Sequence, residues 1–318
     1  MRGQVTTMGL DHAAVADAVR AAHAAALHAS GGANATYIPL LAKVPAQLCG
    51  VCAVTVDGKV FEAGDTRYEF ATESISKVFT LALAIEQCGA EMVRAKIGAR
   101  PTGLPYNSVL ALELHGTKPL SALVNAGAIA TVSLLQASDR EDRWAKILDM
   151  QNRFAGTSIA LSSEINESEQ ATNLYNRAIA WLLASGGNCF CDPLEALDVY
   201  TRQCSTLVTC AKLATMAATL ANRGVNPLTG VSVVKRQNVS RILAEMVMEG
   251  LYDTSGDWAF EVGLPGKSGI GGGIMAVAPG RLGIAAFAPP LDAYGNSVRG
   301  QIAVATVAKR LSLNLYGN

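Results

Sequence analysis

The sequence predicts a protein of the α+β class, with β-structure near both chain ends and helices between them. A β-hairpin is predicted over 51–63, where two apolar runs flank Asp57-Gly58, a pair typical of a two-residue turn. A second hairpin is predicted over 274–286. Between the two, residues 71–225 show almost throughout the spacing of apolar residues that is typical of helices.

The composition is that of a compact globular chain. Of the 318 residues, 50% are hydrophobic and only 16% are charged, so the chain can bury a large core. We expect a single domain spanning 1–318, with a sheet-containing part formed by 1–70 and 226–318 and a helical part formed by 71–225. Lys+Arg and Asp+Glu are equal at 26 each, which gives no net attraction toward nucleic acid.

Neither a membrane protein nor a metal enzyme is predicted. No apolar run approaches the ~20 residues that span a bilayer, and no secretory leader is visible, so we expect a cytoplasmic protein. The odd count of 7 cysteines then favours reduced thiols. Cys49 and Cys52 have C-x-x-C spacing, but no second Cys or His pair completes a zinc site, and we read them as structural. We expect no metal and no cofactor.

Helices account for most of the remaining chain. An alanine-rich helix is predicted over 11–30, with Asp11 as a candidate cap and two glycines at its end. Residues 100–120 are rich in Pro and Gly and are predicted to be mostly loop. Apolar periodicity and capping residues predict further helices at 73–89, 90–98, 138–155, 162–186, 194–203, 208–221, 236–250 and 297–313.

The helix predicted over 73–89 carries the pattern that points to chemistry. It is hydrophobic on nearly every side, so we expect it to be buried. Ser74 and Lys77 are three residues apart on one face near its N-terminus, where unpaired amides and the helix dipole favour negative charge. A desolvated lysine loses its proton readily and can activate a serine hydroxyl. The alternative is that Ser74 only caps the helix and that Lys77 reaches the surface.

A glycine-rich segment at 263–273 is the second part of such a site. Glycine lets the backbone approach a ligand closely and aim its amides. The segment is not a phosphate-binding loop, because a strand-like run follows it instead of a helix. An S-x-x-K motif with a late Lys267-Ser268-Gly269 is the arrangement of serine β-lactamases and penicillin-binding proteins. The two segments together favour a serine acyl-enzyme with backbone donors to an oxyanion.

Four other polar residues are candidates for contacts with a ligand, and each also has a purely structural explanation. Tyr37 is either a packed surface aromatic or part of a substrate lid. Asn125 either caps the helix that follows it or is a buried amide that reads a ligand. Glu169 and Asn176 are seven residues apart and share a helix face if no break lies between them, although the pattern alone favours a solvated face.

Six segments together resemble the serine-dependent glutaminases, which hydrolyse L-glutamine to L-glutamate and ammonia. The resemblance runs in order from about residue 35 to 310 and implies a β-lactamase/transpeptidase-like fold, with an antiparallel sheet built from both chain ends, flanking helices and a large helical middle region. The segments are Tyr37-Ile38-Pro39, Ser74–Phe79, Leu123–Ile129, Met216–Ala221, Gly263–Gly269 and Pro289–Val298.

The resemblance also implies roles for individual residues. It makes Ser74 the nucleophile, Lys77 its base and Tyr252 a residue that assists proton transfer. The backbone amides of Ile270 and Ser74 match the oxyanion hole. The Glu169 carboxylate would bind the substrate ammonium, and the side-chain amides of Asn125 and Asn176 would donate to the substrate carboxylate. The implied substrate ligands are Tyr37, Asn125, Glu169, Asn176 and Tyr200.

The resemblance further implies a homodimer or homotetramer that acts on a small molecule, with no nucleic acid or membrane partner. Two positions depart from the family pattern, namely Thr36, where an acidic residue is common, and Ile270, where valine is common. Ile270 would act through its backbone, so neither departure argues against activity. The competing functions are a β-lactam hydrolase or transpeptidase and a non-catalytic amino-acid-binding relative.

Overall fold

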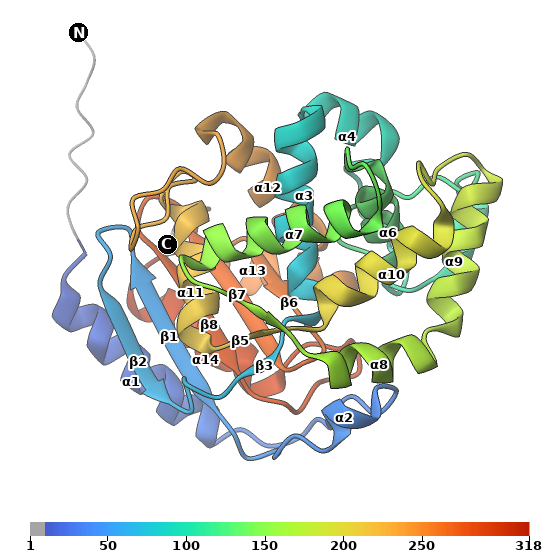
Figure 1. Ribbon diagram of the computed structural model, residues 1–318. Coiled ribbons are helices and arrows are strands. Elements are labelled where there is room, and N and C mark those ends of the chain that lie inside the picture. The colour runs from blue at the N-terminus through green and yellow to red at the C-terminus, as the bar shows by residue number, and fades with distance from the viewer. Residues whose placement is uncertain (1–9, 318) are drawn as a thin grey trace, which may run out of the picture.

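The α+β class and the sheet built from both chain ends are confirmed by the computed structural model, which describes residues 10–317. Five antiparallel strands lie in the order β2-β1-β8-β7-β6, so that the N-terminal hairpin pairs through β1 with the C-terminal strand β8 (Figure 1). The strands are β1 (Gly50–Thr55), β2 (Val60–Gly64), β6 (Gly266–Ser268), β7 (Gly273–Ala278) and β8 (Leu282–Phe287).

Helices surround this sheet and fill the middle of the chain. Their bounds are α1 (His12–Leu27), α2 (Pro39–Ala42), α3 (Ser76–Cys88), α4 (Ala90–Lys96), α5 (Val109–Leu114), α6 (Asn125–Leu134), α7 (Arg140–Ala155), α8 (Ser163–Thr172), α9 (Leu174–Ser185), α10 (Pro193–Cys204), α11 (Cys210–Ala221), α12 (Arg236–Glu249), α13 (Ser255–Glu261) and α14 (Val298–Arg310). None of the helices within residues 10–317 is long and apolar enough to cross a membrane.

Both faces of the central strands are buried, which explains their continuous apolar runs. Successive residues of a strand point to opposite faces, and in β1 Val51 and Ala53 join the core beneath α1 and α14, whereas Cys52 and Val54 join the core of the helical side. On that second face α11 crosses β8 at Gly283, where a side chain would collide with the helix backbone near Ala218. The close approach holds the sheet and the helical side together.

The helical side also contains a small three-stranded sheet that the sequence did not reveal. Its strand order is β3-β5-β4, formed by β3 (Phe70–Ala71), β4 (Ala160–Leu161) and β5 (Thr206–Val208). Strands of two or three residues are too short to show a period, so pattern reasoning does not detect them. This sheet positions the chain immediately before Ser74.

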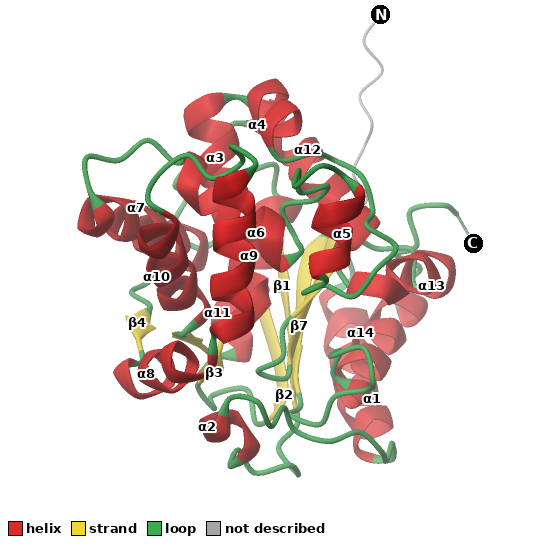
Figure 2. Ribbon diagram, turned by 90° about the vertical axis from the view of Figure 1, so that its right-hand side faces the viewer, coloured by secondary structure: helices red, strands yellow, loops and turns green. Residues whose placement is uncertain are grey.

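Two helices that flank the candidate site come from distant parts of the sequence. The one-turn helix α2 lies beside α8, as both ribbon views show (Figures 1 and 2). Helices α6 and α9 pack against each other nearby (Figure 2). Residues 37, 125, 169 and 176 are thereby brought to one side of α3.

Candidate active site

Ser74 lies in a 3₁₀ turn rather than at the cap of an α-helix. The turn spans Glu73–Ile75, and α3 begins only at Ser76. No side chain caps either helix start, so the alternative that Ser74 is simply an N-cap is wrong. Glu73 has φ of 48°, a left-handed conformation that is uncommon for glutamate and stores strain directly before the serine. The Ser74 side chain is thereby placed at the start of a buried helix.

Lys77 is buried in the first turn of α3 and does not reach the surface. It is 1% exposed, and its Nζ donates to Asn125 Oδ1 at 2.6 Å and to the Leu123 carbonyl at 3.5 Å. Burial lowers the pKa of Lys77 to about 8. Among the described residues no hydrogen bond joins Lys77 Nζ directly to Ser74. The lysine can therefore lose its proton near neutral pH but contacts the amide of Asn125.

Asn125 is the first residue of α6, and its side chain does not cap that helix. The cap position belongs to Val124, while the Asn125 side chain is buried among polar groups. Its Nδ2 donates to Asn176 Oδ1 at 3.0 Å. Its Oδ1 accepts from the Tyr200 hydroxyl at 3.2 Å as well as from Lys77. Asn125 thus connects the lysine to two of the predicted substrate ligands.

Tyr252 provides the direct contact to the nucleophile candidate. It opens a second 3₁₀ turn with φ of 57°, and the Ser74 side chain is close enough to its hydroxyl to lower the pKa of Tyr252 against the larger effect of burial. The same hydroxyl lies 3.5 Å from the Ser268 carbonyl. The Lys267 ammonium lies 4.0 Å from the centre of the Tyr252 ring. Burial raises the pKa of Tyr252 and lowers the pKa of Lys267, so both groups favour their neutral forms.

The glycine-rich turn packs against the backbone that leads into Ser74. A Cβ at Gly271 would lie 2.3 Å from the Ala71 carbonyl, and one at Gly269 would lie 2.8 Å from the Thr72 carbonyl. Only glycine permits this approach. Within residues 10–317 the backbone amide of Ile270 has no hydrogen-bond acceptor, which leaves it available as a donor.

Glu169 and Asn176 reach the same pocket by a route that the sequence did not predict. The helix expected over 162–186 is broken at Asn173 into α8 and α9, so a shared face on one continuous helix is wrong. Both residues nevertheless line one cavity of about 300 Å³, together with Tyr37 and Asn125. Glu169 is 5% exposed, and one of its carboxylate oxygens has no hydrogen-bond partner among the described residues.

The aromatic residue Tyr106 lies at this cavity and was not predicted from the sequence. Tyr106 lines it, and its ring lies 4.6 Å from the ring of Tyr252. The only signal was the length of its loop, because long loops in compact domains are often functional. Tyr37, half exposed, stands at the edge of the cavity.

A buried acidic cluster lies behind the cavity. Ligand atoms of Glu73, Glu169 and Cys204 all fall within 4.8 Å of one another. Three such donors could contact a cation, but burial raises the pKa of each and favours its protonated form, and Lys77 is their charged neighbour. The absence of a metal stays a prediction.

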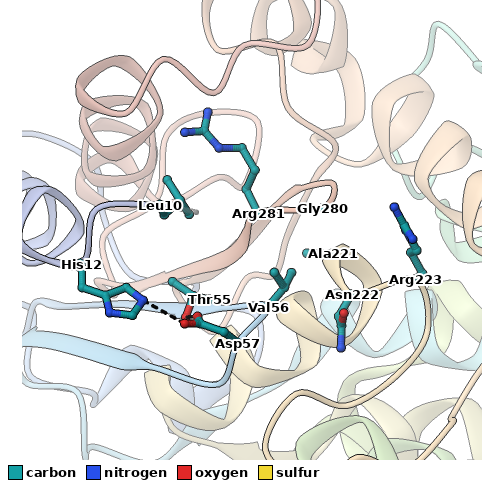
Figure 3. A pocket seen from close by; sticks show the side chains of 10 residues that line it. All are labelled: Leu10, His12, Thr55, Val56, Asp57, Ala221, Asn222, Arg223, Gly280 and Arg281. Carbon is teal, nitrogen blue, oxygen red and sulfur yellow. Dashed lines mark hydrogen bonds and ion pairs between the residues drawn. The ribbon is translucent and has the colours of Figure 1, made fainter. Parts of the chain in front are cut away.

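A larger cavity of about 500 Å³ lies elsewhere, beside the β1–β2 turn and the C-terminal end of α11 (Figure 3). Its charged groups include Arg223, Arg281 and an ion pair in which His12 Nε2 lies 2.9 Å from Asp57 Oδ2. No predicted site residue contributes to its lining, whereas Tyr37, Asn125, Glu169 and Asn176 all line the smaller cavity. The candidate active site is therefore the smaller cavity.

The family model and the most similar sequences both identify one protein family. A glutaminase family model matches residues 32–316. Glutaminase from Bordetella avium strain 197N is 64% identical over 309 residues, covering 97% of this chain and 99% of that relative. Glutaminase 1 from Escherichia coli strain K12 is 64% identical over 287 residues, covering 90% of this chain and 93% of that relative.

Solved structures agree with the sequence relatives. The structure of a probable glutaminase is 61% identical, with a TM-score of 0.96 over 97% of this chain and 100% of the other. A protein described as Mglu in its glutamate form is 33% identical, with a TM-score of 0.91 over 97% of this chain and 71% of that one. These structural neighbours have the β-lactamase-like fold. The chain is therefore an amidohydrolase that belongs to the family of serine-dependent glutaminases.

Proposed function

We propose that the protein hydrolyses L-glutamine to L-glutamate and ammonia through an acyl-enzyme on Ser74. The observation that carries this proposal is the hydrogen bond from the buried Lys77 to Asn125, a residue that lines the cavity. The buried Ser74 side chain lies close enough to the Tyr252 hydroxyl to lower the pKa of that tyrosine against the larger effect of burial. A nucleophile, a lysine with a lowered pKa and a set of polar side chains thus lie close together in a largely dry site.

The polar lining supports an α-amino acid as substrate. One carboxyl oxygen of Glu169 has no hydrogen-bond partner among the described residues. Burial favours the protonated form of Glu169, and a substrate ammonium beside it would stabilise the carboxylate instead. Asn125 and Asn176 carry amide groups that can donate to the substrate carboxylate. The name of the related structure in its glutamate form is in line with this substrate class.

In the proposed first half-reaction, the Ser74 oxygen attacks the side-chain carbonyl carbon of glutamine. Its proton passes to Lys77, because the pKa of Lys77, about 8, suits a base. The Tyr252 hydroxyl delivers its proton to the departing nitrogen and is reprotonated by Lys77, so that the C–N bond breaks, ammonia leaves and Lys77 is neutral again. The amides of Ile270 and Ser74 stabilise the negative oxygen.

In the second half-reaction, water attacks the ester carbonyl and gives a proton to the neutral Lys77, and the C–O bond to Ser74 breaks as this proton is passed to the Ser74 oxygen. Glutamate leaves and the serine is regenerated. Each residue thereby returns to its starting protonation state. The homodimer or homotetramer expected from the sequence stays a prediction.

The test is ammonia release from L-glutamine by purified wild type and by Ser74→Ala. Wild type should release ammonia and the variant should be at least about 10³-fold slower. No release by the wild type contradicts the activity, and full release by the variant contradicts the nucleophile. L-Asparagine and a chromogenic β-lactam in the same assay test the competing functions, and preference for either would replace the present proposal.

A further inference from the structure

The loop between α9 and α10 holds two cysteines that the proposed reaction does not use. Cys189 and Cys191 are each half-buried, whereas four of the other cysteines are buried. The loop joins the helix that carries Asn176 to the helix that carries Tyr200. The two thiols therefore lie near the surface but outside the candidate active site.

The loop places the Cys189 sulfur against the backbone of Cys191. The Cys189 thiol donates to the Cys191 carbonyl at 3.4 Å, and the Cys191 thiol donates to the Asp192 carbonyl at 3.5 Å. The interaction between the two thiols is the largest influence on both pKa values. It lowers the pKa of Cys189 to about 6 and raises the pKa of Cys191. One thiol thus stabilises the other as a thiolate.

Three contacts fix the residues around this pair. The backbone amide of Phe190 donates to Ser133 Oγ at 3.0 Å. The Lys96 ammonium lies 5.3 Å from the centre of the Phe190 ring. Asn188 Nδ2 donates to the Thr117 carbonyl at 3.1 Å. Because the loop is held to α4, α6 and the segment after α5, the proximity of the thiols is built into the fold.

We propose that Cys189 and Cys191 form a thiol–disulfide exchange site for small disulfides, with Cys189 as the attacking thiolate and Cys191 as the resolving thiol. The reactant is a low-molecular-weight disulfide of the glutathione type. Two residues separated by a single residue can have their Cα atoms within the roughly 4.4–6.8 Å that a disulfide requires. The Cys189 sulfur already lies 3.4 Å from the carbonyl oxygen of Cys191, so the first thiol is directed toward the second residue.

The exchange balances in two steps. The Cys189 thiolate attacks one sulfur of the small disulfide, forming a mixed disulfide and releasing one thiolate, which takes up a proton. Cys191 then loses its proton and attacks the Cys189 sulfur, forming the intramolecular disulfide and releasing the second thiol. The protein loses two hydrogens, and the small disulfide is reduced to two thiols.

Cys88 provides a matched control within the same chain. It is also half-buried, but it lies at the end of α3 with no second thiol beside it, and burial raises its pKa. Its thiol donates to the Leu134 carbonyl at 3.9 Å. Burial alone therefore leaves a thiol protonated, whereas the Cys189 thiol has a stabilised thiolate.

The test treats the purified protein with excess oxidised glutathione at pH 7, quenches it with acid and maps the tryptic peptides. Residues 178–202 contain no internal Lys or Arg, so one peptide carries both cysteines. Wild type should yield this peptide about 2 Da lighter, reversed by a reductant. Cys191→Ser should instead accumulate a glutathione adduct on Cys189, and Cys189→Ser should react on the order of tenfold more slowly.

The control variant Cys88→Ser should behave as wild type, and all three cysteine variants should retain wild-type ammonia release, which also reports their folding. Iodoacetamide labelling of Cys189 should reach half of its maximal rate near pH 6. The proposal is overturned if the 178–202 peptide stays reduced while free glutathione disulfide persists, or if Cys189 reacts no faster than Cys88. Failure of glutaminase activity would leave these thiol measurements unaffected, because they do not use the catalytic reaction.

Discussion

Two of the cavities formed by residues 10–317 place their charged side chains in opposite surroundings. In the cavity of about 500 Å³, the His12 and Asp57 side chains are 43% and 55% exposed, so water solvates their ion pair. At the candidate active site of about 300 Å³, Glu169 in the lining is 5% exposed, and Lys77, which donates to the lining residue Asn125, is 1% exposed. The smaller cavity therefore contains groups whose charged forms are destabilised, and the larger one does not.

This difference shows why size does not identify a site. A solvated ion pair contributes only about 0–1 kcal/mol to stability. A desolvated amine or carboxylate changes its pKa, and a shift of one unit corresponds to about 1.4 kcal/mol between protonation states. Burial lowers the pKa of Lys77 to about 8, which suits a general base near neutral pH. Reactivity follows burial of titratable groups rather than cavity volume.

The largest expected effect comes from replacing the buried lysine. Lys77→Met removes the base, and we expect kcat/KM for L-glutamine to fall on the order of 10³-fold. Methionine fills a similar volume without a buried amine, so thermal stability should be retained. The control Lys212→Met removes a half-buried lysine whose Nζ lies 3.3 Å from a carboxylate oxygen of Glu69, and it should change kcat/KM less than about twofold. Equal rates for both variants would place Lys77 outside the chemistry.

The pH profile should report the same lysine. The base must be neutral, and burial lowers the pKa of Lys77 to about 8, so kcat/KM should rise as pH increases through about 8. Below that pH the protonated fraction grows and activity falls about tenfold per unit. The measurement is kcat/KM at constant ionic strength from about pH 6 to 9. A profile without this rise, or the same rise in Lys77→Met, would exclude lysine as the titrating base.

A smaller effect is expected from the substrate-binding carboxylate. Glu169→Gln keeps the shape of the side chain but removes the charge proposed to meet the substrate ammonium, so KM should rise about 10- to 100-fold with a smaller change in kcat. The matched control in the larger cavity is Asp57→Asn, which should alter both constants less than about twofold. If Asp57→Asn raised KM as much as Glu169→Gln, the distinction between the cavities would fail.

The sequence predicted the elements that have local signals. Asp57-Gly58 defined the first hairpin, and the apolar run after Ser74 correctly predicted a buried helix. What it could not predict depended on tertiary packing. The break at Asn173 between α8 and α9 has no proline or glycine to mark it. The burial that lowers the pKa of Lys77 likewise comes from elements far apart in the chain.

The site itself was anticipated mainly through family resemblance. Spacing alone grouped Ser74 with Lys77, whereas the structure joins Ser74 to Tyr252 and Lys77 to Asn125. Tyr106 was not predicted because nothing in its loop distinguishes it from other exposed aromatic residues. Contacts between segments separated by over a hundred residues have no signature in a single sequence.

Covalent labelling of Ser74 tests the central claim most directly. A glutamine analogue with an electrophilic carbon in place of the carboxamide should bind the same pocket and be attacked by the nucleophile. The account predicts one label per chain, located by peptide mapping on Ser74, slowed by L-glutamate and absent from Ser74→Ala. A label on another residue, or equal labelling of Ser74→Ala, would contradict it.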